Sequence, residues 1–100
     1  MQNEKAPYNA IGVVEVNFYA NAVCLLDVME KAADIDFLTS ENRLGGRMVT
    51  LIVGGTTSGV NAAVEAARAA GEGMSVNPIK VAIIISNPHP EILKFFPVKS

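Results

Sequence analysis

The stretch that decides the fold is IDFLTSENRLGGRMVTLIV, residues 35–53. Two strand-like runs, residues 35–40 and 48–53, flank a turn that contains the adjacent glycines Gly45 and Gly46. Glycine adopts the positive φ angles that tight hairpin turns require, so this pattern is typical of a β-hairpin. The stretch therefore predicts two consecutive strands with no helix between them.

A helix is expected on each side of this hairpin. Residues 20–33 carry apolar side chains at the i, i+3, i+4, i+7 spacing of an amphipathic helix. Residues 59–70 are rich in alanine and predict a second helix, ended by Gly71 and Gly73. The many small side chains of this second helix would allow it to pack closely on a sheet.

The outermost elements complete the fold class. Residues 10–16 and 79–85 are almost unbroken apolar runs and predict strands, and residues 91–96 predict a short C-terminal helix. The resulting order, strand-helix-strand-strand-helix-strand, is that of the ferredoxin-like α+β sandwich. Right-handed crossovers would place both main helices on one face of a four-stranded antiparallel sheet. We expect a flexible tail over residues 1–9, one domain over residues 10–96 and a second tail over residues 97–100.

Composition and charge exclude several classes of partner. The chain has 100 residues, of which half are hydrophobic, and a formal net charge of −2, with no basic cluster. Bulk electrostatics therefore favour neither nucleic acid nor an anionic membrane. The apolar runs are too short to span a bilayer, and the N-terminal residues lack the apolar region of a signal peptide. We expect no nucleic-acid partner, no membrane partner and, with Cys24 as the single cysteine, a reducing compartment.

No arrangement of residues in the sequence predicts catalysis or a metal site. His89 is the only histidine and Cys24 the only cysteine, so they supply neither a metal-ligand set nor a catalytic triad. We expect His89 to hydrogen-bond within its own turn and Cys24 to be a small core residue. Residues 54–59 resemble a phosphate-binding turn but lack the Gly-Lys-Ser/Thr of a P-loop, and a helix N-cap explains them. No catalytic residue, metal or cofactor is expected.

Five motifs, in order, resemble those of bacterial microcompartment shell proteins. They are AIGVVE at residues 10–15, DVMEKAA at 27–33, RLGG at 43–46, VTLIVxG at 49–55 (x being any residue) and Pro-His at 88–89. The resemblance runs without gaps over about residues 10–90. The unpermuted element order and the single domain make the chain similar to the hexamer-forming class of this family.

The resemblance implies a structural protein of a shell in the bacterial cytoplasm. It implies a homohexamer that tiles with other shell proteins into flat facets around encapsulated enzymes. Leu44, Gly45 and Gly46 fall on the family's pore loop, between Arg43 and Arg47, and the implied pore would pass small polar or anionic metabolites. Edge contacts between hexamers would be made by Lys31 and by the turn of Asn87, Pro88 and His89. Arg47 stands where glycine is common in the family, and Asn87 where arginine is common.

Plainer interpretations of the same residues remain open at this point. Gly45 and Gly46 could serve only as a hairpin turn, with the two neighbouring arginines paired to acids such as Glu41. Lys31 could be an ordinary solvated lysine near a helix C-terminus, where a cation is favourable. The alternative function is a ferredoxin-like oligomeric regulatory or small-molecule-binding module. An enzyme is disfavoured because no nucleophile and base are paired in the sequence.

Overall fold

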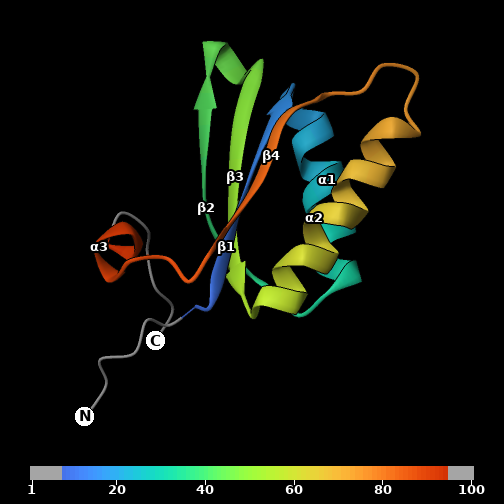
Figure 1. Cartoon of the computed structure of the whole chain (residues 1–100). Coiled ribbons are helices and arrows are strands. Elements are labelled where there is room, and N and C mark those ends of the chain that lie inside the picture. The colour runs from blue at the N-terminus through green and yellow to red at the C-terminus, as the bar shows by residue number, and fades with distance from the viewer. Residues whose placement is uncertain (1–7, 95–100) are drawn as a thin grey trace.

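The computed structural model describes residues 8–94 and shows the predicted α+β fold (Figure 1). Its elements are β1 (Ala10–Asn17), α1 (Tyr19–Ala32), β2 (Asp36–Arg43), a short 3-10 turn (Leu44–Gly46), β3 (Met48–Gly55), α2 (Thr57–Glu72), β4 (Ile79–Ser86) and α3 (Pro90–Leu93). The predicted tails, and the end of the predicted domain at residue 96, fall wholly or largely outside the described residues. Within residues 8–94, no helix is both long and apolar enough to cross a bilayer.

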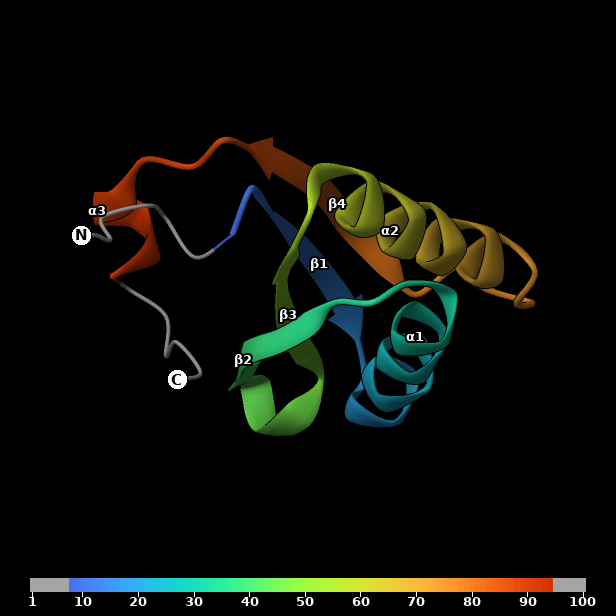
Figure 2. The same cartoon turned by 90° about the horizontal axis from the view of Figure 1, so that it is seen from below.

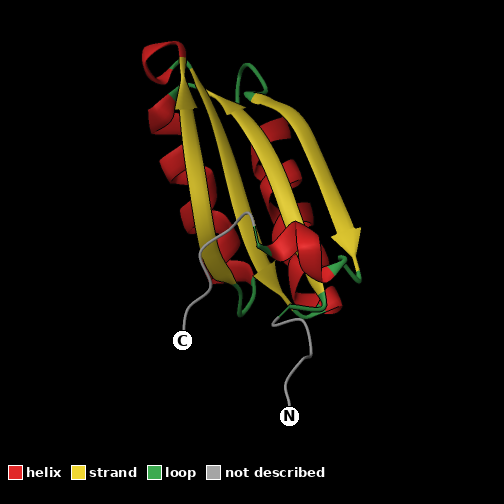
Figure 3. Ribbon diagram, turned by 90° about the vertical axis from the view of Figure 1, so that its left-hand side faces the viewer, coloured by secondary structure: helices red, strands yellow, loops and turns green. Residues whose placement is uncertain are grey.

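The four strands form one antiparallel sheet in the order β2-β3-β1-β4. Helices α1 and α2 cover one face of this sheet, as predicted from right-handed crossovers (Figure 2). The short helix α3 lies on the other, open side (Figure 3). Strands β2 and β4 are therefore the two edges of the sheet, and each leaves one row of backbone groups without a partner strand.

Helix α2 can approach β1 closely because residue 12 has no side chain. A Cβ atom at Gly12 would lie 2.9 Å from Val64 Cγ2 and 3.1 Å from Val60 Cγ1. Both valines are fully buried, and they share their face of α2 with two fully buried alanines. The predicted role of small residues in helix-on-sheet packing is thus realised on both sides of the contact.

A second, smaller apolar cluster occupies the open side of the sheet. It consists of Tyr8, Ile11, Leu38 and Ile52, with Val13 and Ile85 packed against it. The cluster is continued along β4 by aliphatic side chains that remain substantially exposed. The sheet therefore buries apolar surface on both faces, with the larger share under the helices.

The prediction that Cys24 is a core residue is wrong. Cys24 is exposed on α1, whose buried face consists of Ala22, Leu25 and Met29. Successive helical residues are about 100° apart, so Cys24 points well away from its neighbour Leu25. Ala32, within the helix predicted over residues 20–33, is also exposed.

The predicted end of the second helix is only partly correct. Gly73 is the C-cap of α2, but Gly71 lies inside the helix, which runs to Glu72. A Cβ atom at Gly71 would lie 2.7 Å from Asn77 Oδ1 and 2.9 Å from Ile79 Cδ1. Gly71 therefore makes room for the chain that enters β4 instead of ending the helix.

We predict that Gly12→Ala destabilises the fold by about 1–3 kcal/mol, because the added methyl group overpacks the contact with Val64 and Val60. Urea unfolding followed by circular dichroism measures this change. Gly73→Ala is the matched control, since its Cβ would have no neighbour closer than 3.5 Å and its φ of −78° is ordinary. The second variant Gly12→Ala/Val64→Ala should be less destabilised than the sum of its single changes. Equal stability of Gly12→Ala and Gly73→Ala would contradict the packing argument.

Candidate pore and edge residues at opposite ends of the sheet

The turn between β2 and β3 has the positive φ angles that the sequence predicts. Gly45 has φ of 65° and Gly46 has φ of 89°, and Leu44 before them also has a positive φ, 56°. The backbone N–H of Arg47 donates to the carbonyl of Leu44 at 3.3 Å and closes the turn. Apart from the turn itself, no atom of residues 8–94 lies within 4 Å of a Cβ built at Gly45, and Leu44 is 65% exposed. The tip therefore projects into open space, where another molecule can approach its backbone.

The two arginines beside this tip have different partners. Arg43 lies 3.6 Å from Glu41, as the plainer interpretation expects, but both side chains are about two-thirds exposed. Arg47 pairs with no acid within residues 8–94, and its Nε instead donates to the carbonyl of Leu44 at 3.3 Å. An exposed ion pair contributes little free energy, so neither guanidinium is firmly fixed.

The tip is supported by Phe18, a residue that the sequence analysis did not single out. Its backbone N–H donates to the carbonyl of Arg47 at 2.9 Å, which ties the start of α1 to the hairpin. Phe18 has a φ of 72°, unusual for a bulky residue, and the residue is 55% exposed. The signal available in the sequence was the aromatic pair Phe18-Tyr19 between a strand and a helix, in a chain with only six aromatic residues.

The candidate edge residues lie at the other end of the strands. Lys31, in the last turn of α1, pairs with Asp27 at 2.9 Å and is 77% exposed, so in one chain it is a solvated lysine. The backbone N–H of Asn87, whose φ is 54°, donates to the carbonyl of Asn9 at 2.6 Å. Pro88 is buried beside it.

His89 makes the local hydrogen bond that the sequence predicts. Its Nδ1 accepts from the backbone N–H of Glu91 at 3.0 Å and so caps α3. The predicted N-cap within residues 54–59 is also confirmed, because Thr56 Oγ1 accepts from the N–H of Gly59 at 3.0 Å. The side chains of both motifs therefore serve local structure.

The register of the sheet separates the two candidate sets by a full strand length. Met48 of β3, next to the hairpin tip, pairs with Asn17, whereas Gly55 pairs with Ala10 at the other end. Ala10 also pairs with Ser86, directly before Asn87. A strand of eight residues spans about 24 Å at ~3.4 Å per residue. The sequence-predicted pore residues are thus brought together at one end, and the edge residues at the other.

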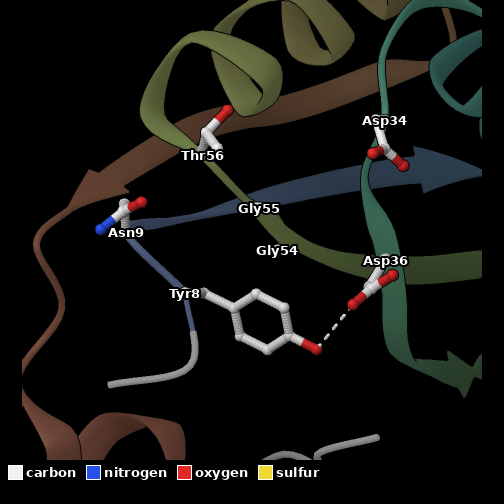
Figure 4. A pocket seen from close by; sticks show the side chains of 7 residues that line it. All are labelled: Tyr8, Asn9, Asp34, Asp36, Gly54, Gly55 and Thr56. Carbon is white, nitrogen blue, oxygen red and sulfur yellow. Dashed lines mark hydrogen bonds between the residues drawn. The ribbon is translucent and has the colours of Figure 1, made fainter. Parts of the chain in front are cut away.

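A polar pocket of about 240 Å³ lies at the edge end of the sheet (Figure 4). It is lined by Tyr8, Asn9, Asp34, Asp36, Gly54, Gly55 and Thr56. The Tyr8 hydroxyl donates to Asp36 Oδ2 at 3.0 Å. Burial raises the pKa of Tyr8 above its ordinary value of 10.0, and the hydrogen bond to Asp36 and the negative charge of that carboxylate raise it further. Within residues 8–94, no three His, Cys, Asp or Glu side chains are grouped closely enough to hold a metal ion.

A model of the BMC domain family matches residues 10–88, which is most of the chain. The chain belongs to the BMC domain family. This BMC domain is 33% identical, over 88% of its length, to bacterial microcompartment shell protein PduA of Citrobacter freundii, of which it covers 91%. It is 39% identical, over 83% of its length, to carboxysome shell protein CsoS1A of Hydrogenovibrio crunogenus, of which it covers 84%.

Two longer proteins are also similar to this BMC domain. It is 37% identical to the probable carboxysome shell protein CsoS1E of Prochlorococcus marinus over 83% of its length, but spans only 40% of that protein. The crystal structure of a microcompartment protein from Desulfitobacterium hafniense superposes with a TM-score of 0.68 and 32% identity, covering 85% of this chain and 44% of the other. The fold and the family predicted from the sequence are thus confirmed.

We predict that the unfolding free energy of the protein falls as the pH rises above about 10. The raised pKa of Tyr8 means that the unfolded chain loses this proton at lower pH than the folded chain, so the stabilisation present below pH 10 disappears as the folded Tyr8 ionises. Tyr8→Phe should lower stability at pH 8 by about 1 kcal/mol through loss of the hydrogen bond to Asp36, and should reduce the alkaline slope. Urea titrations between pH 8 and 11 measure both effects.

Tyr19→Phe is the control for this experiment, because it removes the hydroxyl of the other tyrosine, which is 57% exposed. It should leave the stability at pH 8 unchanged, because Tyr8 keeps its hydrogen bond to Asp36. A Tyr8→Phe variant with the slope of the unmodified protein would refute the assignment to Tyr8.

Proposed function

We propose that this BMC domain is a structural shell protein of a bacterial microcompartment, in which six copies form a ring around the hairpin tips. The observation that carries the proposal is the placement of the two residue sets in a chain of this family. The exposed glycine tip lies at one end of the sheet, and Lys31 with the turn of Asn87 lies at the other. A ring with the tips on its axis has the second set on its rim.

The proposed ring has a pore whose lining is backbone and arginine. Gly45 and Gly46 expose backbone groups at the tip, and successive backbone N–H groups favour anions. Arg43 and Arg47 add positive charge from weakly held side chains. Rings of cationic side chains select anions in pores, so we assign the pore to small polar or anionic metabolites. The protein would let metabolites pass through the pore and would enclose the enzymes of the compartment. It would catalyse no reaction itself.

The proposed rim joins rings into flat facets with other shell proteins of the same compartment, around the enclosed enzymes. Lys31 is available for such a contact because its pair with Asp27 is exposed and weak. The conformation of Asn87 fixes the direction in which the chain leaves the rim end of β4. Symmetric contacts that are individually weak add up over a sheet of many rings.

A second candidate is a small-molecule-binding module, and the polar pocket around Asp34 and Asp36 is the observation that favours it. Mass in solution separates the two candidates. A mass of six chains, with ordered sheets in electron micrographs, supports the shell protein. A monomer, dimer or trimer stabilised by a small ligand supports the module.

The pore assignment predicts the effect of reversing the loop charge. In shells reconstituted with Arg43→Glu/Arg47→Glu, the ratio of anion to cation flux should fall by about tenfold, because a ring of charge changes the local ion concentration on this scale. Flux of charged fluorescent probes into filled shells measures the ratio. Arg43→Lys/Arg47→Lys keeps the charge and should keep the ratio. Unchanged selectivity in the glutamate variant would rule out a role for these arginines.

The rim assignment predicts that Lys31→Asp leaves rings intact but prevents their assembly into sheets. Six reversed charges around each rim would repel one another across every contact between rings. Negative-stain micrographs of sheets and the mass of the soluble ring measure the two effects. Lys94→Asp is the control, because Lys94, the C-cap of α3, is likewise exposed and paired with an acid of the preceding turn, Glu91, at 3.0 Å. Sheets that persist in Lys31→Asp would contradict the rim contact.

A further inference from the structure

The carbonyl of Leu44, at the turn that joins β2 and β3 in Figure 1, accepts two hydrogen bonds from one residue. The backbone N–H of Arg47 donates to it at 3.3 Å, and Nε of the Arg47 side chain also donates to it at 3.3 Å. A backbone carbonyl oxygen has two lone pairs, and both are used here. The carbonyl is therefore masked, and its repulsion of an approaching anion is reduced.

The same contact decides which part of the Arg47 side chain stays free. A guanidinium carries five N–H donors, of which Nε supplies one and the two Nη atoms supply the rest. Nε is turned to the carbonyl of Leu44, and within residues 8–94 neither Nη atom of Arg47 donates to a protein group. We call these two atoms the Nη fork. A planar fork of this kind fits the paired oxygens of a carboxylate or phosphate group.

The two arginines that flank the tip differ in how available they are. Arg43 lies 3.6 Å from Glu41, whereas Arg47 has no acidic partner within residues 8–94. An internal carboxylate competes with an incoming oxyanion for the same guanidinium. Arg43 is therefore the poorer receptor for an oxyanion, although it carries the same charge as Arg47.

Apolar side chains lie around the tip. Leu44 is 65% exposed, and Tyr19 lies beside the second glycine, since its Cβ is 3.8 Å from a Cβ built at Gly46. Phe18, whose N–H donates to the carbonyl of Arg47 at 2.9 Å, is 55% exposed. Apolar surface near a charge lowers the local dielectric constant, which strengthens a charge-assisted hydrogen bond. The tip thus offers an oxyanion a stronger contact than an isolated surface arginine does.

We propose that Arg47 makes the pore selective for oxyanions, because its Nη fork binds the carboxylate or phosphate group of a passing metabolite. This assignment rests on the proposed ring and narrows the class of metabolite from polar or anionic molecules in general. A halide has the charge but lacks the paired oxygens that the fork fits. One exposed fork per chain gives a site that a metabolite can both enter and leave, as conduction requires.

Equilibrium binding to purified rings tests the assignment. Calorimetric titrations measure the dissociation constants of formate, inorganic phosphate and chloride at constant ionic strength, because salt screens exposed charges. The unmodified ring should bind formate or phosphate about tenfold more tightly than chloride, since each oxyanion gains a second hydrogen bond to a charged group.

Two lysine variants separate the fork from the charge. Arg47→Lys keeps the charge but removes the fork, and should raise the dissociation constants of the oxyanions about tenfold while changing that of chloride by less than about twofold. Arg43→Lys is the matched control, because it is the same substitution at an arginine that already faces Glu41. It should change all three constants by less than about twofold. The mass of the ring should be the same in both variants.

A flux measurement tests whether the binding site lies in the pore. In reconstituted shells, formate bound at the site should slow the passage of chloride. The formate concentration that halves the chloride flux should rise about tenfold in Arg47→Lys, in step with the weaker binding. Chloride flux that formate does not slow, in rings that bind formate, would overturn the placement of the site in the pore.

Each outcome of the binding experiment bears on one hypothesis. Equal affinity for formate and phosphate in Arg47→Lys and in the unmodified ring overturns the assignment, while the proposed shell function stands. An equal loss of affinity in Arg47→Lys and Arg43→Lys overturns the distinction between the two arginines. A preference for formate over phosphate, or the reverse, supports the assignment and identifies the group that is recognised. A protein that never forms rings, by mass, instead refutes the shell function on which the assignment rests.

Discussion

The fold depends on the close approach of α2 to β1 at Gly12. This contact sets the depth at which the helix layer lies on the sheet, and the fully buried valines of α2 fill the space that a side chain at residue 12 would occupy. With α2 held over β1 and β4, α1 has room only over β1 and β3. Strand β2 then extends beyond the helix layer. This leaves an apolar hollow of about 130 Å³ between α1 and the strands β2 and β3. The packing at Gly12, in the centre of the core, thus determines that β2 lies largely uncovered at the margin of the sheet.

Backbone strain is concentrated at the two ends of the sheet. The described chain has three non-glycine residues with positive φ: Phe18, Leu44 and Asn87. Phe18 and Leu44 lie at the hairpin end, joined through the hydrogen bond from Phe18 to Arg47, and Asn87 lies at the rim end. Such conformations cost free energy and persist where the surrounding structure fixes them. All three therefore lie in the connections at the ends of the sheet, where the proposed pore and rim residues are found.

The element order and the hairpin were predictable because they follow from local patterns: hydrophobic period, adjacent glycines and an N-cap at Thr56. The candidate pore and rim residues were proposed as a set through resemblance to a family, and their roles stay predictions. The geometry of these residues could not be predicted, because the register that separates Asn87 from Gly45 depends on pairing between distant strands. Cys24 and Gly71 were misassigned for a related reason. Whether a residue near an apolar stripe is buried depends on which other helix or strand packs against it. The local sequence does not determine that tertiary contact.

The separation of loop and rim by the length of a strand has an evolutionary consequence. Within the described chain, the hairpin tip and the turn at Asn87 share no hydrogen bond. The paired strands β3 and β1 lie between them. If the proposed ring is correct, a substitution in the tip alters permeability without changing the outline by which rings fit together. Duplicated copies of such a gene could diverge at residues 43–47 and still occupy one lattice, so that a single facet carries pores of several kinds. Diversification of transport would then require no new architecture.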